Sequence, residues 1–199
     1  MARNRFTHSL IWLLILPAWL ACGVTAAADK ARGVAIDPPK QITKNTLTDQ
    51  EGRPAVFPAG QWQLVFFGFT NCPDVCPVTL HKAMQVMKQP GPQVAALKVT
   101  FISIDPERDK PEVVKAYVAA HGTGIQGLTG NLVATQKVGS EFEVVVRRYQ
   151  DRETATPRFE HSAFLYLLDP QGRLVMFYPA TVEASGITAD IVRLAKAGK

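Results

Sequence analysis

The chain has 199 residues, of which 47% are hydrophobic and 20% charged, and its formal net charge is +5. This composition is typical of a globular protein with one domain and its own core, and it excludes a disordered or coiled-coil protein. Without the first 28 residues the net charge is +3 and the basic residues form no cluster, which argues against a nucleic-acid-binding protein.

The first 28 residues have the pattern of an export signal. Arg3 and Arg5 precede an apolar run over 10–21, and small residues follow at Ala26 and Ala28. We therefore predict that residues 1–28 are a signal peptide or membrane anchor. The protein is expected in the bacterial periplasm, tethered to the inner membrane if the segment is retained.

Two alternatives to simple cleavage stay open. The segment is retained as an anchor, although its apolar run is shorter than the ~20 residues of a full span. Alternatively, Cys22 is a lipid-attachment cysteine, for which Trp19 three positions upstream is a poor fit. Export follows in every case.

Residues 29–41 are polar and rich in proline, which is typical of a tether. One folded domain is expected over 42–199. Its first feature is a turn within 47–53 between two short extended segments, which predicts a hairpin. The run 63–69 is almost continuously apolar, as in a central strand that is buried on both faces.

The rest of the domain alternates between predicted helices and strands. Helices are expected over 78–88, 110–120, 132–142 and 187–197, and strands over 97–104, 143–147, 162–168 and 174–178, with a loop over 149–158. This alternation predicts an α/β fold with a central mixed sheet flanked by helices and an N-terminal hairpin.

Two cysteines, Cys72 and Cys76, lie four positions apart where the 63–69 strand leads into a helix. A disulfide across so short a loop would add little stability through chain entropy, so a redox or metal role is favoured over a structural bridge. Pro77 suits the first helical position, and Asp74 suits a helix cap. Because a helix N-terminus favours negative charge, we expect the pKa of a thiol there to lie below its usual range.

A metal would need a third ligand, and His161 stands where another apolar strand begins. Two thiolates and one imidazole form a trigonal set that suits Cu(I) and is tolerable for Cu(II). Structural zinc usually takes four protein ligands, so copper is favoured. A histidine at such a position is more often a packed or solvated residue, and His81, one turn past Cys76, is the alternative third ligand.

Three segments resemble the SCO/SenC family of copper proteins: 67–77 (FGFTNCPDVCP), 103–113 (SIDPERDKPEV) and 161–173 (HSAFLYLLDPQGR). The resemblance implies a thioredoxin-like fold and a metallochaperone that delivers copper to the binuclear copper centre of cytochrome c oxidase. The copper-site subunit of that oxidase, or another copper protein, is then the expected partner.

Carried over residue by residue, the family's copper ligands fall on Cys72, Cys76 and His161. Asn71 and Glu160 depart from the family's usual residues, although Glu160 keeps the negative charge of the more common aspartate. A metallochaperone of this kind would not be an enzyme.

The alternative function is a thiol–disulfide oxidoreductase. In that case Cys72 and Cys76 would cycle between dithiol and disulfide and keep the cysteines of a copper-site target reduced. Periplasmic copper carriers and thiol reductants are further expected partners.

Overall fold

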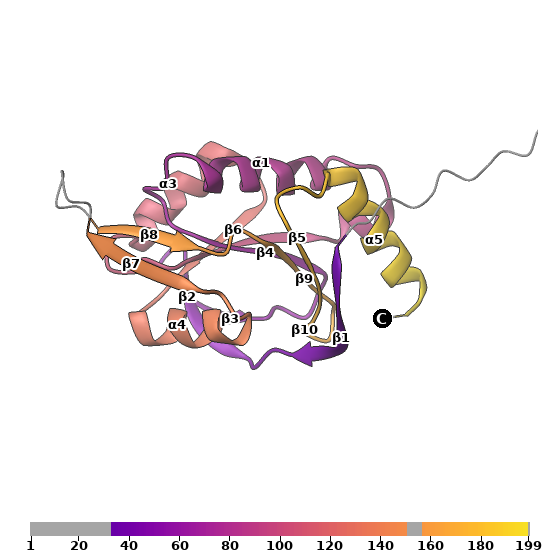
Figure 1. Cartoon of the computed structure of the whole chain (residues 1–199), viewed down its shortest axis with the longest axis horizontal. Helices are drawn as coiled ribbons and strands as arrows, with labels where there is room; N and C mark the ends of the chain where they lie inside the picture. The colour runs from indigo at the N-terminus through magenta and orange to yellow at the C-terminus, as the bar shows by residue number, and fades with distance from the viewer. Residues whose placement is uncertain (1–32, 151–156, 199) are drawn as a thin grey trace, which may run out of the picture.

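The computed structural model describes residues 33–150 and 157–198 (Figure 1). The expected leader over 1–28, with Cys22, lies outside these residues. Within the described ranges, no helix is both long enough and apolar enough to cross a membrane.

An eight-stranded mixed sheet forms the centre of the domain, in the order β1–β10–β9–β4–β5–β6–β2–β3. Strands β4, β5 and β6 run parallel, and all other neighbours are antiparallel. The strands are β1 (Val34–Gln41), β2 (Asn45–Asp49), β3 (Pro54–Phe57), β4 (Gln63–Gly68), β5 (Lys98–Ser103), β6 (Ile125–Thr129), β9 (Leu165–Leu168) and β10 (Arg173–Tyr178).

Helices cover both faces of this sheet, so its central strands are buried on both sides (Figure 1). One face packs against α1 (Val75–Met87), α3 (Pro111–His121) and α5 (Ala184–Lys196), with the short α2 (Pro92–Ala95) beside α5. The other face packs against α4 (Leu132–Glu141). This arrangement confirms the expected α/β fold, and β2 with β3 is the expected N-terminal hairpin.

The apolar run that predicted a central strand is β4, in which all six residues are buried. Its side chains alternate between the two cores: Phe66 packs on the side of α1, and Phe67 on the side of α4. The carboxyl end of β4 leads directly into the segment with the two cysteines.

Helix α1 begins at Val75, three residues before the expected start, so Pro77 is its third residue and not its first. The reason is that none of the first four N–H groups of a helix has a partner within the helix. A proline therefore fits the third position as well as the first.

Strand β1 occupies residues that were expected to belong to the tether. Val34–Gln41 pairs antiparallel with β10 at the edge of the sheet, so the expected tether over 29–41 overlaps the folded domain. All eight of its residues are exposed or half-buried. Such an edge strand lacks the apolar pattern by which a buried strand is predicted.

A separate two-stranded sheet, β7 (Val146–Gln150) with β8 (Pro157–His161), projects from the domain. The predictions here were wrong: the strand expected over 143–147 starts three residues later, and β7 and β8 extend into the expected loop over 149–158. The strand expected over 162–168 starts at Leu165, as β9. His161 is consequently the last residue of β8, where it faces Val146.

Candidate metal centre

Cys72 and Cys76 lie on either side of the start of α1, and both are free thiols. Cys72 is half-buried in the loop after β4, whereas Cys76 is the second residue of α1 and is fully buried. The Cys76 sulfur lies against Gly68, where a β-carbon would come within 3.0 Å of it. Glycine at the end of β4 thus makes room for this sulfur, a role that the sequence analysis missed.

His161 reaches this sulfur from the end of β8, in the hairpin that β7 and β8 form. Its Nε2 lies 3.7 Å from the Cys76 Sγ, and its Nδ1 lies 3.2 Å from the Ser162 carbonyl oxygen. A carbonyl can only accept, so Nδ1 carries the hydrogen and donates it to Ser162. The lone pair of a neutral imidazole is then on Nε2, on the side of the thiol.

Two aromatic rings flank the imidazole. Phe66 on β4 lies 6.1 Å from the His161 ring between centroids, and Phe69 lies 6.0 Å from it, edge to face. Burial among these groups lowers the pKa of His161, although the hydrogen bond to Ser162 acts in the opposite direction. The neutral imidazole, which is the form that can bind a metal, is therefore favoured.

The pKa of Cys76 departs from expectation. Burial raises it well above its usual range, the neighbouring Cys72 thiol raises it further, and a hydrogen bond from the Phe69 backbone opposes the shift. The expected lowering is thus wrong for Cys76, because loss of solvation outweighs the favourable helix N-terminus. In this state Cys76 is a protonated thiol, and a metal ion would have to displace its proton.

Two further residues that the sequence singled out are His81 and Asp74. His81 is exposed on α1 and contacts Gln85, with 3.2 Å between the two Nε2 atoms. Five residues along a helix correspond to a rotation of about 140°, so His81 does not share the side of Cys76. Asp74 occupies the cap position of α1, but its carboxyl makes no capping hydrogen bond, so the expected cap is wrong.

The structure thus brings together Cys76 and His161, with Cys72 beside them. Among the described residues, no three His, Cys, Asp or Glu side chains are close enough to hold one metal ion. In chemical type the three side chains suit a soft cation such as copper. To share one ion, they would have to draw closer together.

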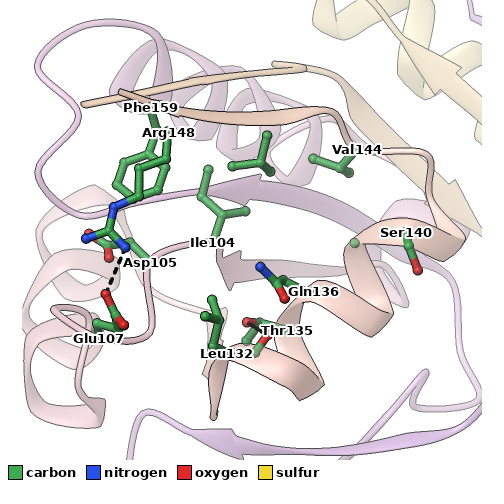
Figure 2. Close-up of a pocket in the computed structure, with 12 residues that line it drawn as sticks. Ile104, Asp105, Glu107, Leu132, Thr135, Gln136, Ser140, Val144, Arg148 and Phe159 are labelled. Atoms are coloured by element: carbon green, nitrogen blue, oxygen red, sulfur yellow. Dashed lines mark hydrogen bonds and ion pairs between the residues drawn. The ribbon is translucent and has the colours of Figure 1, made fainter. Parts of the chain in front are cut away.

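Two hollows lie next to the hairpin. A shallow, open depression of about 290 Å³ is lined by Val145, Arg147, Glu160, His161 and Ser162, so solvent reaches the histidine there. Figure 2 shows the second, a cavity of about 300 Å³ that Phe159 and Arg148 line on one side and α4 on another, with Arg148 paired with Glu107. This cavity includes neither cysteine nor His161, so it is distinct from the candidate metal centre.

Comparison with known proteins gives close agreement over this domain. The SCO1/SenC family model matches residues 35–196. The human mitochondrial protein SCO2 homolog is 34% identical over 136 residues, which cover 67% of this chain and 51% of the human protein. The chain thus spans about half the length of that relative.

Solved structures of SCO proteins are also similar to this chain. Bradyrhizobium japonicum ScoI with copper bound has a TM-score of 0.66 and 30% identity, covering 77% of this chain and 98% of that chain. A SCO1/SenC family lipoprotein from Bacillus anthracis has a TM-score of 0.69 and 26% identity, covering 81% and 99%. The fold is thioredoxin-like, and the chain belongs to the SCO1/SenC family.

Proposed function

We propose that this protein is a copper metallochaperone that binds copper through Cys72, Cys76 and His161 and delivers it to the copper centre of cytochrome c oxidase during assembly. The observation that carries the proposal is the distance of 3.7 Å between the Cys76 Sγ and the His161 Nε2, with the Cys72 thiol beside them. The copper bound to the ScoI relative of Bradyrhizobium japonicum supports the choice of metal.

The environment of these side chains favours a cargo that can be both held and released. Copper binding replaces the proton of each thiol, so the affinity falls as the pH decreases. The depression that His161 helps to line is open to solvent, which gives a recipient protein access to this one of the three ligands. Transfer by exchange of one ligand at a time requires such access.

Loading also requires a local rearrangement. The described side chains do not yet bracket one ion, whereas Cys76 and His161 are already neighbours. Cys72 is half-buried in a loop, so it is the donor with the most freedom to approach the other two. We therefore expect the loop with Cys72 to move more than α1 when copper binds.

An anaerobic copper titration of the reduced full-length chain, combined with X-ray absorption, tests the proposal. We expect one copper per chain, with two sulfur ligands and one nitrogen ligand. H161A should remove the nitrogen ligand and lower the affinity at least about tenfold, or about 1.4 kcal/mol. H81A is the matched control, because His81 is an exposed histidine of α1, and it should keep the wild-type affinity. Absence of stoichiometric copper in the wild type, or an unchanged nitrogen ligand in H161A, contradicts the proposal.

A thiol–disulfide oxidoreductase is the second candidate, because two neighbouring free thiols can form a disulfide. In that reaction Cys72 and Cys76 would lose two electrons and two protons to a target disulfide, which becomes a dithiol. H161A separates the two functions: it should abolish tight copper binding and leave the reduction potential of the cysteine pair nearly unchanged.

We also propose that residues 1–28 direct export and that the folded domain acts outside the cytoplasm. The charged, apolar and small-residue pattern of this segment supports the proposal. So does the Bacillus anthracis relative, which is described as a lipoprotein. Fractionation of cells, with mass spectrometry of the mature N-terminus, distinguishes cleavage, lipidation at Cys22 and retention. Recovery of the protein with residues 1–28 in the cytoplasm contradicts export.

A further inference from the structure

Asp109 is a buried residue that connects the ends of three neighbouring strands. It lies between β5 and α3 and is only 1% exposed. Its Oδ1 accepts a hydrogen bond from the Thr70 hydroxyl at 2.6 Å. Its Oδ2 accepts from the Thr70 backbone N–H at 3.1 Å and from the Ser103 hydroxyl at 2.6 Å. Its backbone carbonyl accepts from the Thr129 hydroxyl at 2.7 Å.

Two of these hydrogen bonds hold the start of the cysteine loop, residues 69–74 between β4 and α1. Thr70 directly follows Phe69 and lies two residues before Cys72. Another hydrogen bond of this loop, from the Cys72 N–H to the Phe69 carbonyl at 3.3 Å, stays within the same segment. Asp109 therefore supplies a connection between the cysteine loop and the neighbouring strands β5 and β6.

A buried carboxyl is costly unless donors compensate it, so its position calls for a reason. The nearby Asp105 pairs with Arg108, but within the described ranges no basic side chain forms an ion pair with Asp109. Three donors in hydrogen-bond contact offset the cost instead, and two of the three belong to Thr70. Organising a turn would not require a carboxyl in contact with a residue 39 positions earlier in the chain.

We propose that Asp109 is a positioning residue of the thiol site: through Thr70 it holds the loop so that the Cys72 sulfur stays within reach of Cys76 and His161. Its role in copper binding rests on the proposed function. Its role in bringing the two sulfurs together does not, because the equilibrium between dithiol and disulfide reports that distance without any metal.

Three variants separate position from charge. D109A removes all three side-chain hydrogen bonds, and T70V removes only the hydrogen bond from the Thr70 hydroxyl. D109N keeps the shape: its amide oxygen can occupy the place of Oδ2, and its NH₂ group can donate to the Thr70 hydroxyl, which is able to accept. D190A is the matched control. Asp190, in α5, is also 1% exposed, and its carboxyl accepts a hydrogen bond from the Gly33 N–H at 3.0 Å.

The readouts are copper affinity and the reduction potential of the Cys72–Cys76 pair in the full chain. D109A should weaken copper binding about 10–100-fold, as the loss of a group that orients a ligand commonly does. It should also lower the equilibrium constant for disulfide formation about tenfold, which raises the reduction potential by about 30 mV. T70V should shift both in the same direction by less. D109N should stay close to wild type, and D190A should lose stability alone.

The outcomes are distinct. D109A that loses stability but keeps both properties, as D190A should, overturns the proposal. If D109A does not fold, T70V decides, and wild-type values for T70V overturn it. Equal losses in D109N and D109A at unchanged stability also overturn it, because the charge and not the position would then matter. If the wild type binds no copper, the proposed function fails, while the disulfide equilibrium still tests Asp109.

Discussion

The sulfur of Cys76 lies against the backbone of Gly68, so close that a β-carbon on residue 68 would come within 3.0 Å of it. Gly68 ends β4, and Cys76 is in the first turn of α1. The contact therefore fixes how closely the helix approaches the strand end. It also limits the size of the residue that this strand end can accept.

Substitution of Gly68 by alanine should destabilise the domain and displace the Cys76 side chain. The new β-carbon would also lie 2.7 Å from Phe66 Cε1 and 3.1 Å from Phe101 Cε2, and both rings are fully buried. Such overpacking costs about 1–3 kcal/mol, measurable by urea unfolding. G139A in α4 is the control, because its β-carbon would meet only Val144 at 3.9 Å. Equal stability of G68A and wild type would show that the strand end yields easily.

The two thiols should react in a fixed order. Cys72 is half-buried, whereas Cys76 has no exposed surface and a raised pKa that originates mainly in burial. In the reduced native protein, iodoacetamide should therefore alkylate Cys72 at least about tenfold faster than Cys76, since only an accessible thiolate reacts. The single variants C76S and C72S isolate each rate by mass spectrometry, and in urea the rates should converge. A native C72S variant that reacts as fast as C76S contradicts this order.

Replacement of Tyr117 by phenylalanine should leave stability unchanged or raise it by about 1 kcal/mol. The Tyr117 hydroxyl is buried and has no hydrogen-bond partner among the described residues, while its ring packs against Phe101 at 5.2 Å. Removal of a buried unsatisfied group relieves a desolvation cost, and the ring contact is kept. In the control Y178F, a hydroxyl that contacts the Met176 sulfur at 3.4 Å is lost, so stability should fall slightly. Thermal unfolding that ranks Y117F below Y178F excludes this interpretation.

Asp49 should contribute stability that disappears in acid. Partial burial raises its pKa, but hydrogen bonds from Arg53 and from the Glu51 N–H outweigh this and lower the pKa below its usual value. The folded state thus binds the proton less readily than the unfolded state. The contribution is complete above pH ~4 and is lost as the pH falls through the folded-state pKa.

The variant D49N measures this contribution, since its amide oxygen can still accept the two backbone hydrogen bonds that Oδ1 now receives. Urea unfolding at pH 7 and pH 3 should show a difference between wild type and D49N that narrows in acid. A difference that stays constant with pH would mean that the charge of Asp49 contributes nothing.

The sequence predicts those parts of the fold in which burial leaves an apolar pattern. β4 and β5 were predicted because both of their faces are covered, so all six residues of β4 and five of the six of β5 are buried, with four and three apolar residues, respectively. β1 and β8 were missed because their stability comes from backbone pairing with β10 and β7, which any side chain allows. An edge strand or hairpin with polar side chains gives no periodic signal.

The candidate site divides in the same way. The spacing of the cysteines and their position after a buried strand are local features, so the pair was predictable. The approach of His161 to Cys76 joins residues 85 positions apart, and it was mainly the resemblance to a family that singled out His161 among the histidines. The raised pKa of Cys76 was not predictable, because a helix start does not reveal which side chain of its first turn points into the core.

Among the residues that the structure describes, β7 and β8 form no backbone pairs with the eight-stranded sheet, although β8 carries His161. A two-stranded sheet opens far more often than the interior of a large one. The imidazole and the thiols therefore belong to parts of the molecule with different lifetimes. A cargo held by the imidazole and the thiols would be released in a fixed sequence, from the nitrogen first and from the sulfurs afterwards. The rate at which the hairpin opens would then set the rate of release.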